Sequence, residues 1–205
     1  MIITEIRPQK GHLVGLYSDG EQIVSLDSEL AAEMNLRAMR DYSVEELQEL
    51  LGISMLRRAK SKALYLLEFR DYSSRDMAVR LRRDKEFDEE SIHQAMVYLI
   101  EIGAIDDSRY AENMIRHLIN HKHYGIRRVL QELAAKGIDR DTAETALCES
   151  EVDERSMILE LLESKFSRDL DDEKGIRRTI ASLIRYGYEM GDIRDSLREF
   201  CDRGL

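Results

Sequence analysis

The stretch YGIRRVLQELAAKGI, residues 124–138, recurs 50 residues later as KGIRRTIASLIRYGY, residues 174–188. In both copies a Gly-Ile-Arg-Arg motif opens a segment whose apolar residues stand three or four apart, the spacing of an amphipathic helix. Each copy then reaches a glycine, Gly137 or Gly187, at the place where helices commonly end. A third segment of this kind opens 52 residues before the first, at Tyr72-Ser73-Ser74-Arg75-Asp76.

A period near 50 residues indicates a tandem array in which each repeat is one supersecondary unit. From residue 54 onward, capping residues and apolar spacing predict nine helices, three in each unit. We therefore expect a mainly α fold of three tandem three-helix repeats, over residues 53–104, 105–151 and 152–205. A single unit of this size has a small core, so the repeats should stack and form an elongated, curved body.

Residues 1–52 have a different pattern, which predicts a small three-stranded antiparallel β-sheet followed by helices. Short β-prone runs cover residues 2–6, 13–17 and 22–26. Asp19-Gly20 separates the last two, and this pair is typical of a type I′ hairpin turn because both central residues need positive φ.

Helix signals follow these strands. Asp27 or Ser28 is expected to cap a short helix, and Ser43, followed by Glu45-Glu46, is expected to cap a second one that ends at Gly52. Ser54 then looks like the cap of the first repeat helix. These signals place the boundary between the N-terminal module and the first repeat at residues 52 and 53.

The composition argues against several classes of protein. The net charge is −10 over 205 residues, which does not favour coating of nucleic acid through bulk positive charge. The sequence has no Gly-rich phosphate loop, no Ser-His-Asp order and no paired-carboxylate context, so we expect no enzyme, no catalytic residues and no cofactor. His117 and His121 have a spacing that can bind zinc, but without a further ligand they are more typical of a surface, and no metal is expected.

The location of the protein is also suggested by the sequence. No stretch approaches the roughly 18 to 20 apolar residues of a membrane span. The N-terminus lacks a basic lead followed by an apolar run, and Cys148 and Cys201 stand alone in the sequence. These features predict a cytoplasmic protein with reduced, partly buried thiols.

The positive charge is concentrated in one segment. Residues 57–85 hold ten basic and four acidic residues, a net charge of +6. Arg and Lys side chains there could contact phosphates or an acidic protein groove, or could simply form solvated helix faces. The candidates for partner binding in this segment are Arg57, Arg58, Lys60, Lys62, Arg75, Arg80, Arg82, Arg83 and Lys85. Tyr65 and Phe69 could stack on bases, but their four-residue spacing favours the core.

Further candidates come from the repeated motif. Arg127-Arg128 and Arg177-Arg178 follow helix starts, the unfavourable end for a cation near the helix dipole. Such a placement suggests a specific acceptor, either an acidic side chain in the adjacent helix, such as Asp106 or Asp107, or a bound partner. Lys136, before the glycine that ends the first copy, completes the set of candidates.

The sequence resembles one known family over about residues 58–202. The stretch GAIDDSRYA, residues 103–111, resembles the turn Gly-x-hydrophobic-Asp-Asp-x-x-aromatic-Ala of the RecX family. Residues 125–138 resemble the family's helix Gly-x-x-Arg-Ile-x-x-Glu-Leu-x-x-Lys-Gly-Ile. The N-terminal strands and Ser43-Val44-Glu45-Glu46-Leu47 resemble the extra module of longer members. The chain departs from the family in being more acidic than a strong DNA binder should be.

The resemblance implies a function. RecX-like proteins are three tandem three-helix repeats that lodge in the groove of the RecA filament on single-stranded DNA. A regulator of homologous recombination, DNA repair and the SOS response is therefore expected, one that inhibits the ATPase, strand-exchange and coprotease activities of RecA. The expected partners are the RecA filament and, weakly, single-stranded DNA, with the protein a monomer. The alternatives are a stand-alone nucleic-acid-binding protein that uses residues 57–85, and a scaffold for other proteins.

Overall fold

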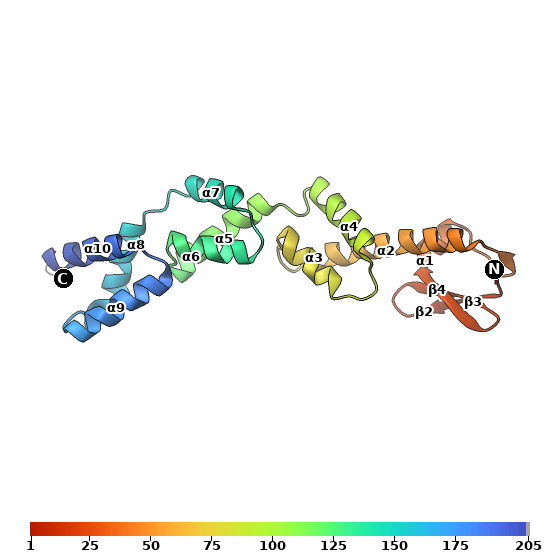
Figure 1. Ribbon diagram of the computed structural model, residues 1–205, viewed down its shortest axis with the longest axis horizontal. Coiled ribbons are helices and arrows are strands. Elements are labelled where there is room, and N and C mark those ends of the chain that lie inside the picture. The colour runs from red at the N-terminus through yellow and green to blue at the C-terminus, as the bar shows by residue number, and fades with distance from the viewer. Residues whose placement is uncertain (204–205) are drawn as a thin grey trace. The chain divides into compact units, whose positions relative to one another are not determined.

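The computed structural model describes residues 1–203, and the chain folds as two units. The first, Met1–Ile105, holds a small sheet and a first set of helices, and the second begins at Asp106 and holds two further sets of three (Figure 1). The prediction of a mainly α chain with a small antiparallel sheet at its N-terminus is confirmed. Over the described residues no helix is long and apolar enough to cross a membrane.

The N-terminal module contains two antiparallel sheets. A three-stranded meander is formed by β2 (Glu5–Gln9), β3 (Leu13–Ser18) and β4 (Glu21–Asp27), and a two-stranded pair by β1 (Ile2–Ile3) and β5 (Arg40–Asp41). Between β3 and β4, Asp19 and Gly20 have φ values of 50° and 86°, which confirms the predicted two-residue turn. The strand β2 continues through Pro8, which an edge strand tolerates because proline has no backbone N–H to donate to a second neighbouring strand.

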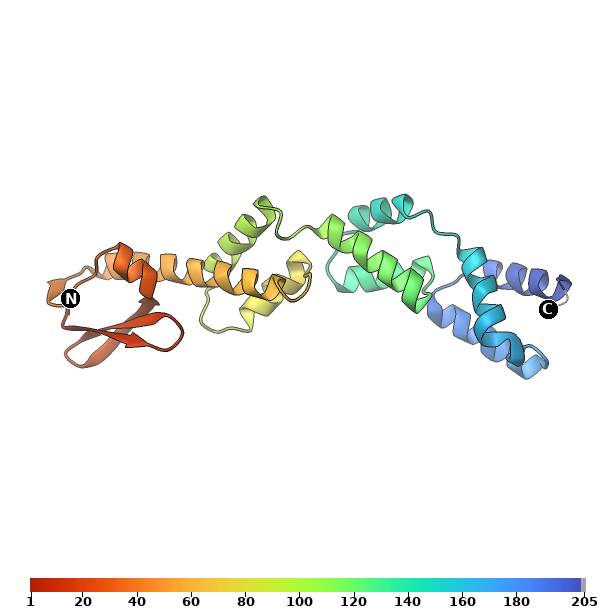
Figure 2. The same ribbon diagram turned by 180° about the vertical axis from the view of Figure 1, so that it is seen from behind.

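Two predicted helix starts in this module are confirmed. Asp27 caps α1 (Ser28–Glu33), since its Oδ1 accepts hydrogen bonds from the backbone N–H groups of the first turn. Ser43 caps α2 (Val44–Leu67) in a reciprocal capping box with Glu46. Figure 2 shows the sheet lying beside α1 and the first part of α2.

The predicted end of a helix at Gly52 and the predicted cap at Ser54 are both wrong. The helix α2 runs without interruption from Val44 to Leu67, and Ser54 is fully buried within it. A glycine inside a helix costs only about 1 kcal/mol, and packing on both sides of it outweighs that cost. Leu47 and Leu50 pack on the sheet, while Ala63 packs on later helices. The Ser54 Oγ accepts a 2.7 Å hydrogen bond from the backbone N–H at the end of β4.

The first unit is completed by α3 (Ser74–Arg82) and α4 (Glu89–Glu101). The expected caps, Ser73 and Asp88, accept hydrogen bonds from backbone N–H groups of the first turn at 3.1 and 2.8 Å. The end of α2 packs with both helices around one apolar cluster, whose most buried members are Ala63, Met77, Leu81, Ile92, Leu99 and Ile105. The helix α2 thus packs against both the sheet and this cluster, and the boundary predicted at residues 52 and 53 lies inside it. The proposed division of the chain into four parts stays a prediction.

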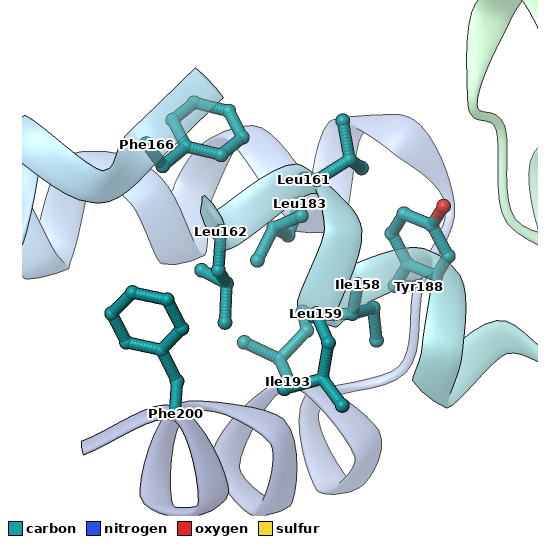
Figure 3. Close-up of a cluster of buried hydrophobic side chains, with 9 residues drawn as sticks. All are labelled: Ile158, Leu159, Leu161, Leu162, Phe166, Leu183, Tyr188, Ile193 and Phe200. Carbon is teal, nitrogen blue, oxygen red and sulfur yellow. The ribbon is translucent and has the colours of Figure 1, made fainter. Parts of the chain in front are cut away.

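The second unit contains two sets of three helices. The first set is α5 (Asp107–Lys122), α6 (Ile126–Ala135) and α7 (Arg140–Glu149). The second is α8 (Glu154–Leu161), α9 (Glu173–Tyr186) and α10 (Met190–Asp202), with a π-helical turn Leu162–Phe166 and a 3₁₀ turn Ser167–Asp169 after α8. Figure 3 shows Leu162, Leu183, Ile193 and Phe200 converging in the core of this second set.

The two copies of the repeated stretch end in the same way. Gly137 and Gly187 have φ values of 83° and 100°, a left-handed conformation that glycine adopts at little cost. The next residue in each copy donates its N–H back to a leucine carbonyl, from Ile138 to Leu133 and from Tyr188 to Leu183, at 3.1 and 3.2 Å. The helix ends predicted at these glycines are therefore confirmed, and the two copies end equivalently, although Gly125 precedes α6 whereas Gly175 lies within the first turn of α9.

Candidate partner-binding residues and an arginine–tyrosine cleft

Much of the basic segment, residues 57–85, is paired with carboxylates of its own unit. Arg57 binds Glu33 through both terminal nitrogens, and this hydrogen bond holds the pKa of the Glu33 carboxyl below its ordinary value. Similar ion pairs join Arg58 to Glu86, Lys62 to Asp84 and Arg82 to Glu89. The Lys60 ammonium lies 3.9 Å from the centre of the Tyr98 ring. The side chains of these five candidates therefore already interact with other residues of the first unit when no partner is bound.

Four candidates of this segment are without such partners. Within residues 1–203, the side chains of Arg75, Arg80, Arg83 and Lys85 form no ion pair or ring contact. Arg75 also borders a groove of about 530 Å³ between α3 and α4, which has apolar side chains such as Ile92 and Met96 on its walls. Within residues 57–85, the positive charge available to a partner is therefore centred on α3 and the loop after it.

Tyr65 and Phe69 were expected in the core, and this expectation is wrong. Their side chains are 55% and 69% exposed, and the two rings meet edge to face with centroids 4.9 Å apart. The core side of α2 is instead marked by Ala59 and Ala63, which are fully buried. The apolar spacing of α2 fits more than one helix face, and only its packing on α4 decides which face is covered.

The start of α6 lies directly against the end of α9. Gly125 donates its N–H to the carbonyl of Tyr186 at 2.8 Å. A Cβ at Gly125 would lie 2.9 Å from the carbonyl of Gly187, and a Cβ at Gly187 would lie 2.5 Å from the backbone nitrogen of Arg128. The two glycines therefore permit an approach that any side chain would prevent.

Two side chains strengthen this junction. Glu154 at the start of α8 accepts a 2.7 Å hydrogen bond from the N–H of Ile126, and so caps α6, whose own N-cap residue is a glycine. The Tyr188 hydroxyl donates to the carbonyl of His123 at 2.9 Å. Burial raises the pKa of Tyr188 well above its ordinary value, so the hydroxyl stays protonated and remains a donor.

The junction forms one wall of a cleft of about 540 Å³ between α6 and α9. We call it the arginine–tyrosine cleft, and its lining residues are Tyr124, Arg127, Arg128, Gln131, Ile184, Arg185, Tyr186 and Gly187. The two tyrosine rings lie 6.0 Å apart, centre to centre, with planes inclined by 48°. Lys165 reaches the same place, since its Nζ donates to the Tyr186 hydroxyl and lies 5.0 Å from the ring centre.

The cleft carries excess positive charge. Arg128 pairs with Glu132 one helical turn onward at 2.6 Å. Arg127 reaches only the Ile184 carbonyl at 3.4 Å, and Arg185 donates to the Ser182 hydroxyl at 3.0 Å, so neither has a carboxylate partner within residues 1–203. Two guanidinium groups therefore stand beside two aromatic rings with their charge uncompensated.

The other candidates from the repeated motif lie elsewhere. Arg177 and Arg178 are in the first turns of α9, exposed, and pair with Glu173 at 2.5 Å and Asp169 at 3.8 Å. Lys136 caps the far end of α6 and does not line the cleft. The acidic partners of the motif arginines are thus on the same helix or just before it, whereas Asp106 caps α5.

The sequence motif located only part of this cleft. Arg127 and Arg128 were predicted, but Tyr124, Tyr186 and Arg185 were not predicted as site residues. The available signal was an aromatic residue directly before each glycine that forms the junction, at positions 124 and 186.

The histidines and cysteines noted in the sequence can also be located. The rings of His117 and His121 lie 5.3 Å apart, and no group of three or more His, Cys, Asp or Glu over residues 1–203 is placed to hold a metal ion. Cys148 and Cys201 are free thiols, but both are exposed, so the expectation of partial burial is wrong.

Comparison with known proteins assigns the chain to a family. The model of the RecX second three-helix domain matches residues 106–147, and that of the RecX first three-helix domain matches residues 59–99. A regulatory protein RecX of Clostridioides difficile is 30% identical over 203 residues, covering 97% of this chain and 95% of the relative. One from Pectobacterium atrosepticum is 34% identical over 148 residues, covering 72% and 82%.

Solved structures agree on the fold. A crystal structure of regulatory protein RecX aligns with a TM-score of 0.67 at 21% identity, over 95% of this chain and 98% of that one. The RecX crystal structure from Lactobacillus salivarius aligns with a TM-score of 0.64 at 24% identity, over 71% and 96%. Since the likeness to curated relatives extends over nearly the whole chain, this protein belongs to the RecX family of regulatory proteins.

Proposed function

We propose that this protein is a non-enzymatic regulator of homologous recombination and the SOS response, which binds the RecA filament on single-stranded DNA and inhibits it. The inhibited activities are ATP hydrolysis, strand exchange and coprotease activity, and the protein acts as a cytoplasmic monomer. One observation carries the proposal: the similarity to regulatory protein RecX covers 97% of this chain, including the N-terminal module.

The distribution of charge supports a protein filament as the main partner. The chain has a net charge of −10, and the basic segment loses much of its free charge to internal ion pairs. A surface of this kind is poorly suited to tight binding of bare DNA, because such binding grows with the number of phosphates that Lys and Arg neutralise. Contact with DNA is then a local addition to contact with protein.

The test is ATP hydrolysis by RecA on single-stranded DNA, with this protein titrated well below the DNA concentration. A regulator of the filament should inhibit at such ratios, because one bound molecule affects many RecA subunits. The same titration read by strand exchange and by cleavage of a coprotease substrate separates the three activities. Absence of inhibition at every ratio would contradict the proposal.

A stand-alone nucleic-acid-binding protein is the second candidate. It is favoured by the four cations of residues 57–85 that form no ion pair or ring contact there, Arg75, Arg80, Arg83 and Lys85, and by the exposed aromatic pair Tyr65 and Phe69. This function predicts high affinity for bare DNA that falls steeply as salt is raised. Binding to DNA without RecA, measured at several salt concentrations, distinguishes it from the first candidate.

A further inference from the structure

We propose that the arginine–tyrosine cleft between α6 and α9 binds a nucleotide unit, with the phosphate at Arg127 and Arg185 and the base against Tyr124 and Tyr186. The ligand chemistry is thus an anionic phosphate joined to an aromatic ring. It could come from a free nucleotide or from one nucleotide of a single strand. No motif for phosphate binding in the sequence marks this place, since the cleft forms only where α9 meets α6.

The size of the cleft suits such a ligand. Its volume of about 540 Å³ lies within the range of pockets that take small molecules and cofactors, roughly 300 to 1,000 Å³. The polar groups on its walls are mainly of two kinds, guanidinium and phenol, with Ile184 as an apolar surface between them.

The charge of the cleft favours a phosphate. Arg127 and Arg185 have no carboxylate partner within residues 1–203, and Glu132, on the same helix as Arg127, is engaged by Arg128. Guanidinium groups bind phosphate oxygens through paired N–H donors, and they carry their charge at every relevant pH. The two arginines come from different helices, so their convergence depends on the junction and not on the sequence motif alone.

The aromatic rings favour a nucleotide over a simple anion. Tyr124 and Tyr186 are half-buried, and each precedes a glycine of the junction, where the Gly125 hydrogen bond to the Tyr186 carbonyl fixes both backbones. Rings held in this way lose little conformational freedom on binding. Stacking on a base is tolerant of sequence, as a regulator acting along a strand requires.

An acidic peptide is the competing ligand for the same arginines. Its carboxylates would bind the guanidinium groups, but they would make no use of two fixed phenol rings. A nucleotide would contact the guanidinium groups through its phosphate and the rings through its base. The inference rests on the proposed function only for the source of the strand, namely the DNA of the filament. The binding test below contains no RecA, so it can fail while the filament assay succeeds, and the reverse also holds.

The test measures fluorescence anisotropy of a labelled oligodeoxythymidylate of about 12 nucleotides with the full-length protein, a length within the range of single-strand binding sites. The double variant R127A/R185A is compared with R177A/R178A, which removes the same charge from the exposed start of α9. We expect the first to weaken binding about tenfold and the second less than twofold. In R127A/R185A the slope of log affinity against log salt should also become shallower, by about 0.7 for each phosphate that is no longer neutralised.

The rings are tested separately. Tyr186→Phe keeps the stacking surface and should bind like the unaltered protein, whereas Tyr186→Ala should weaken binding about tenfold, within the range for loss of one stacked base. Far-ultraviolet circular dichroism shows whether either variant has lost its helices. Competition by deoxyadenosine monophosphate would assign the site to free nucleotides, and competition only by an unlabelled strand would assign it to nucleic acid; both support the proposal.

Three results overturn it. One is absence of oligonucleotide and mononucleotide binding by the unaltered protein. Another is equal weakening by R127A/R185A and R177A/R178A, which would indicate bulk charge and no site. The last is competition by an oligoglutamate of matched charge as effective as that by the strand, which would make the cleft a site for acidic protein segments.

Discussion

The carboxylate of Glu154 accepts a 2.7 Å hydrogen bond from the backbone N–H of Ile126, so a residue of one three-helix set caps a helix of the set before it. Helices commonly carry their own N-cap side chain, but α6 begins after Gly125, which has none to offer. Glycine is needed there because a Cβ would lie 2.9 Å from the Gly187 carbonyl. Because the two sets approach so closely, α6 begins after a glycine and lacks a local cap. Glu154 of the neighbouring set supplies the cap instead.

Replacement of Glu154 tests this cap. Glu154→Ala leaves the Ile126 N–H without its partner and should lower the free energy of unfolding by about 1 to 2 kcal/mol, as for loss of other helix caps. Glu154→Gln keeps an oxygen acceptor and should cost much less. The measurement is urea unfolding followed by circular dichroism. Equal destabilisation by both substitutions would show that the charge of Glu154, and not its role as an acceptor, stabilises the junction.

The pH dependence follows from the same residue. Burial is the main cause that raises the pKa of Glu154 above its ordinary value of 4.5, with Asp192 and Glu189 adding to it. The folded chain therefore holds this proton more tightly than the unfolded chain. The stability that Glu154 contributes by holding this proton is complete below about pH 4.5, and it is lost as the pH rises through the raised pKa. Glu154→Gln should lack this loss. As the pH rises from about 4 to 7, the free energy of unfolding of the variant should therefore increase relative to that of the unaltered protein, as measured by unfolding curves.

Gly187→Ala is expected to disrupt the junction. Gly187 has a φ of 100°, and a Cβ would meet the backbone nitrogen of Arg128 at 2.5 Å. The unfavourable φ alone costs about 1 kcal/mol, and the clash adds to it, so a loss above about 2 kcal/mol is expected in urea unfolding. The matched control is Gly52→Ala in the middle of α2, where, apart from the adjoining helix backbone, no atom of residues 1–203 lies within 4 Å of the added methyl. That variant should be more stable by about 0.5 to 1 kcal/mol.

The repeat itself suggests a stabilising substitution. Thr179 and Val129 occupy equivalent positions in the two copies, and both are buried. The Thr179 hydroxyl has no hydrogen-bond partner among the described residues 1–203, while Val129 fills its place with a methyl group. Thr179→Val should therefore raise the free energy of unfolding by about 1 kcal/mol, since it removes an unsatisfied buried polar group. Val129→Thr is the reciprocal control and should be destabilising by a similar amount; a stabilising effect there would contradict the argument.

Local chemistry made much of the fold predictable. The caps at Asp27, Ser43 and Asp88, the Asp19-Gly20 turn and the left-handed glycines each depend on a few neighbouring residues, and the structure has them as expected. Gly52 was misinterpreted because the signal for a helix end is also local, whereas the continuity of α2 depends on packing against a sheet and against α4.

The candidate site was less predictable for the same reason. Arg127 and Ile184 are 57 residues apart in sequence, and the cleft exists only because two glycines let α6 and α9 meet. The pairing of Arg57 with Glu33 and of Arg58 with Glu86 likewise joins residues 24 and 28 apart. A count of basic residues shows how much charge a segment has, but it does not show how much of that charge is already compensated by the fold.

That difference leads to a prediction about the basic segment. Arg80 and Arg83 have no ion pair within residues 1–203, whereas Arg57 and Arg58 are each bound to a glutamate. If the segment contacts the filament, the double variant R80A/R83A should raise the concentration needed to inhibit RecA ATP hydrolysis about fivefold, equivalent to about 1 kcal/mol of binding. The variant R57A/R58A removes the same charge but should change it less than twofold, because those guanidinium groups are already occupied.

Thermal unfolding of both variants provides the control for this comparison. R57A/R58A loses two ion pairs of the first unit and should unfold at a lower temperature than R80A/R83A, the reverse of their order in the inhibition assay. Opposite orders in the two measurements would separate residues that contact the partner from residues that support the fold. If R57A/R58A were instead the weaker inhibitor at a temperature where both double variants are folded, that result would mean that Arg57 and Arg58 leave their glutamates on binding. The contact surface would then lie on α2 rather than on α3.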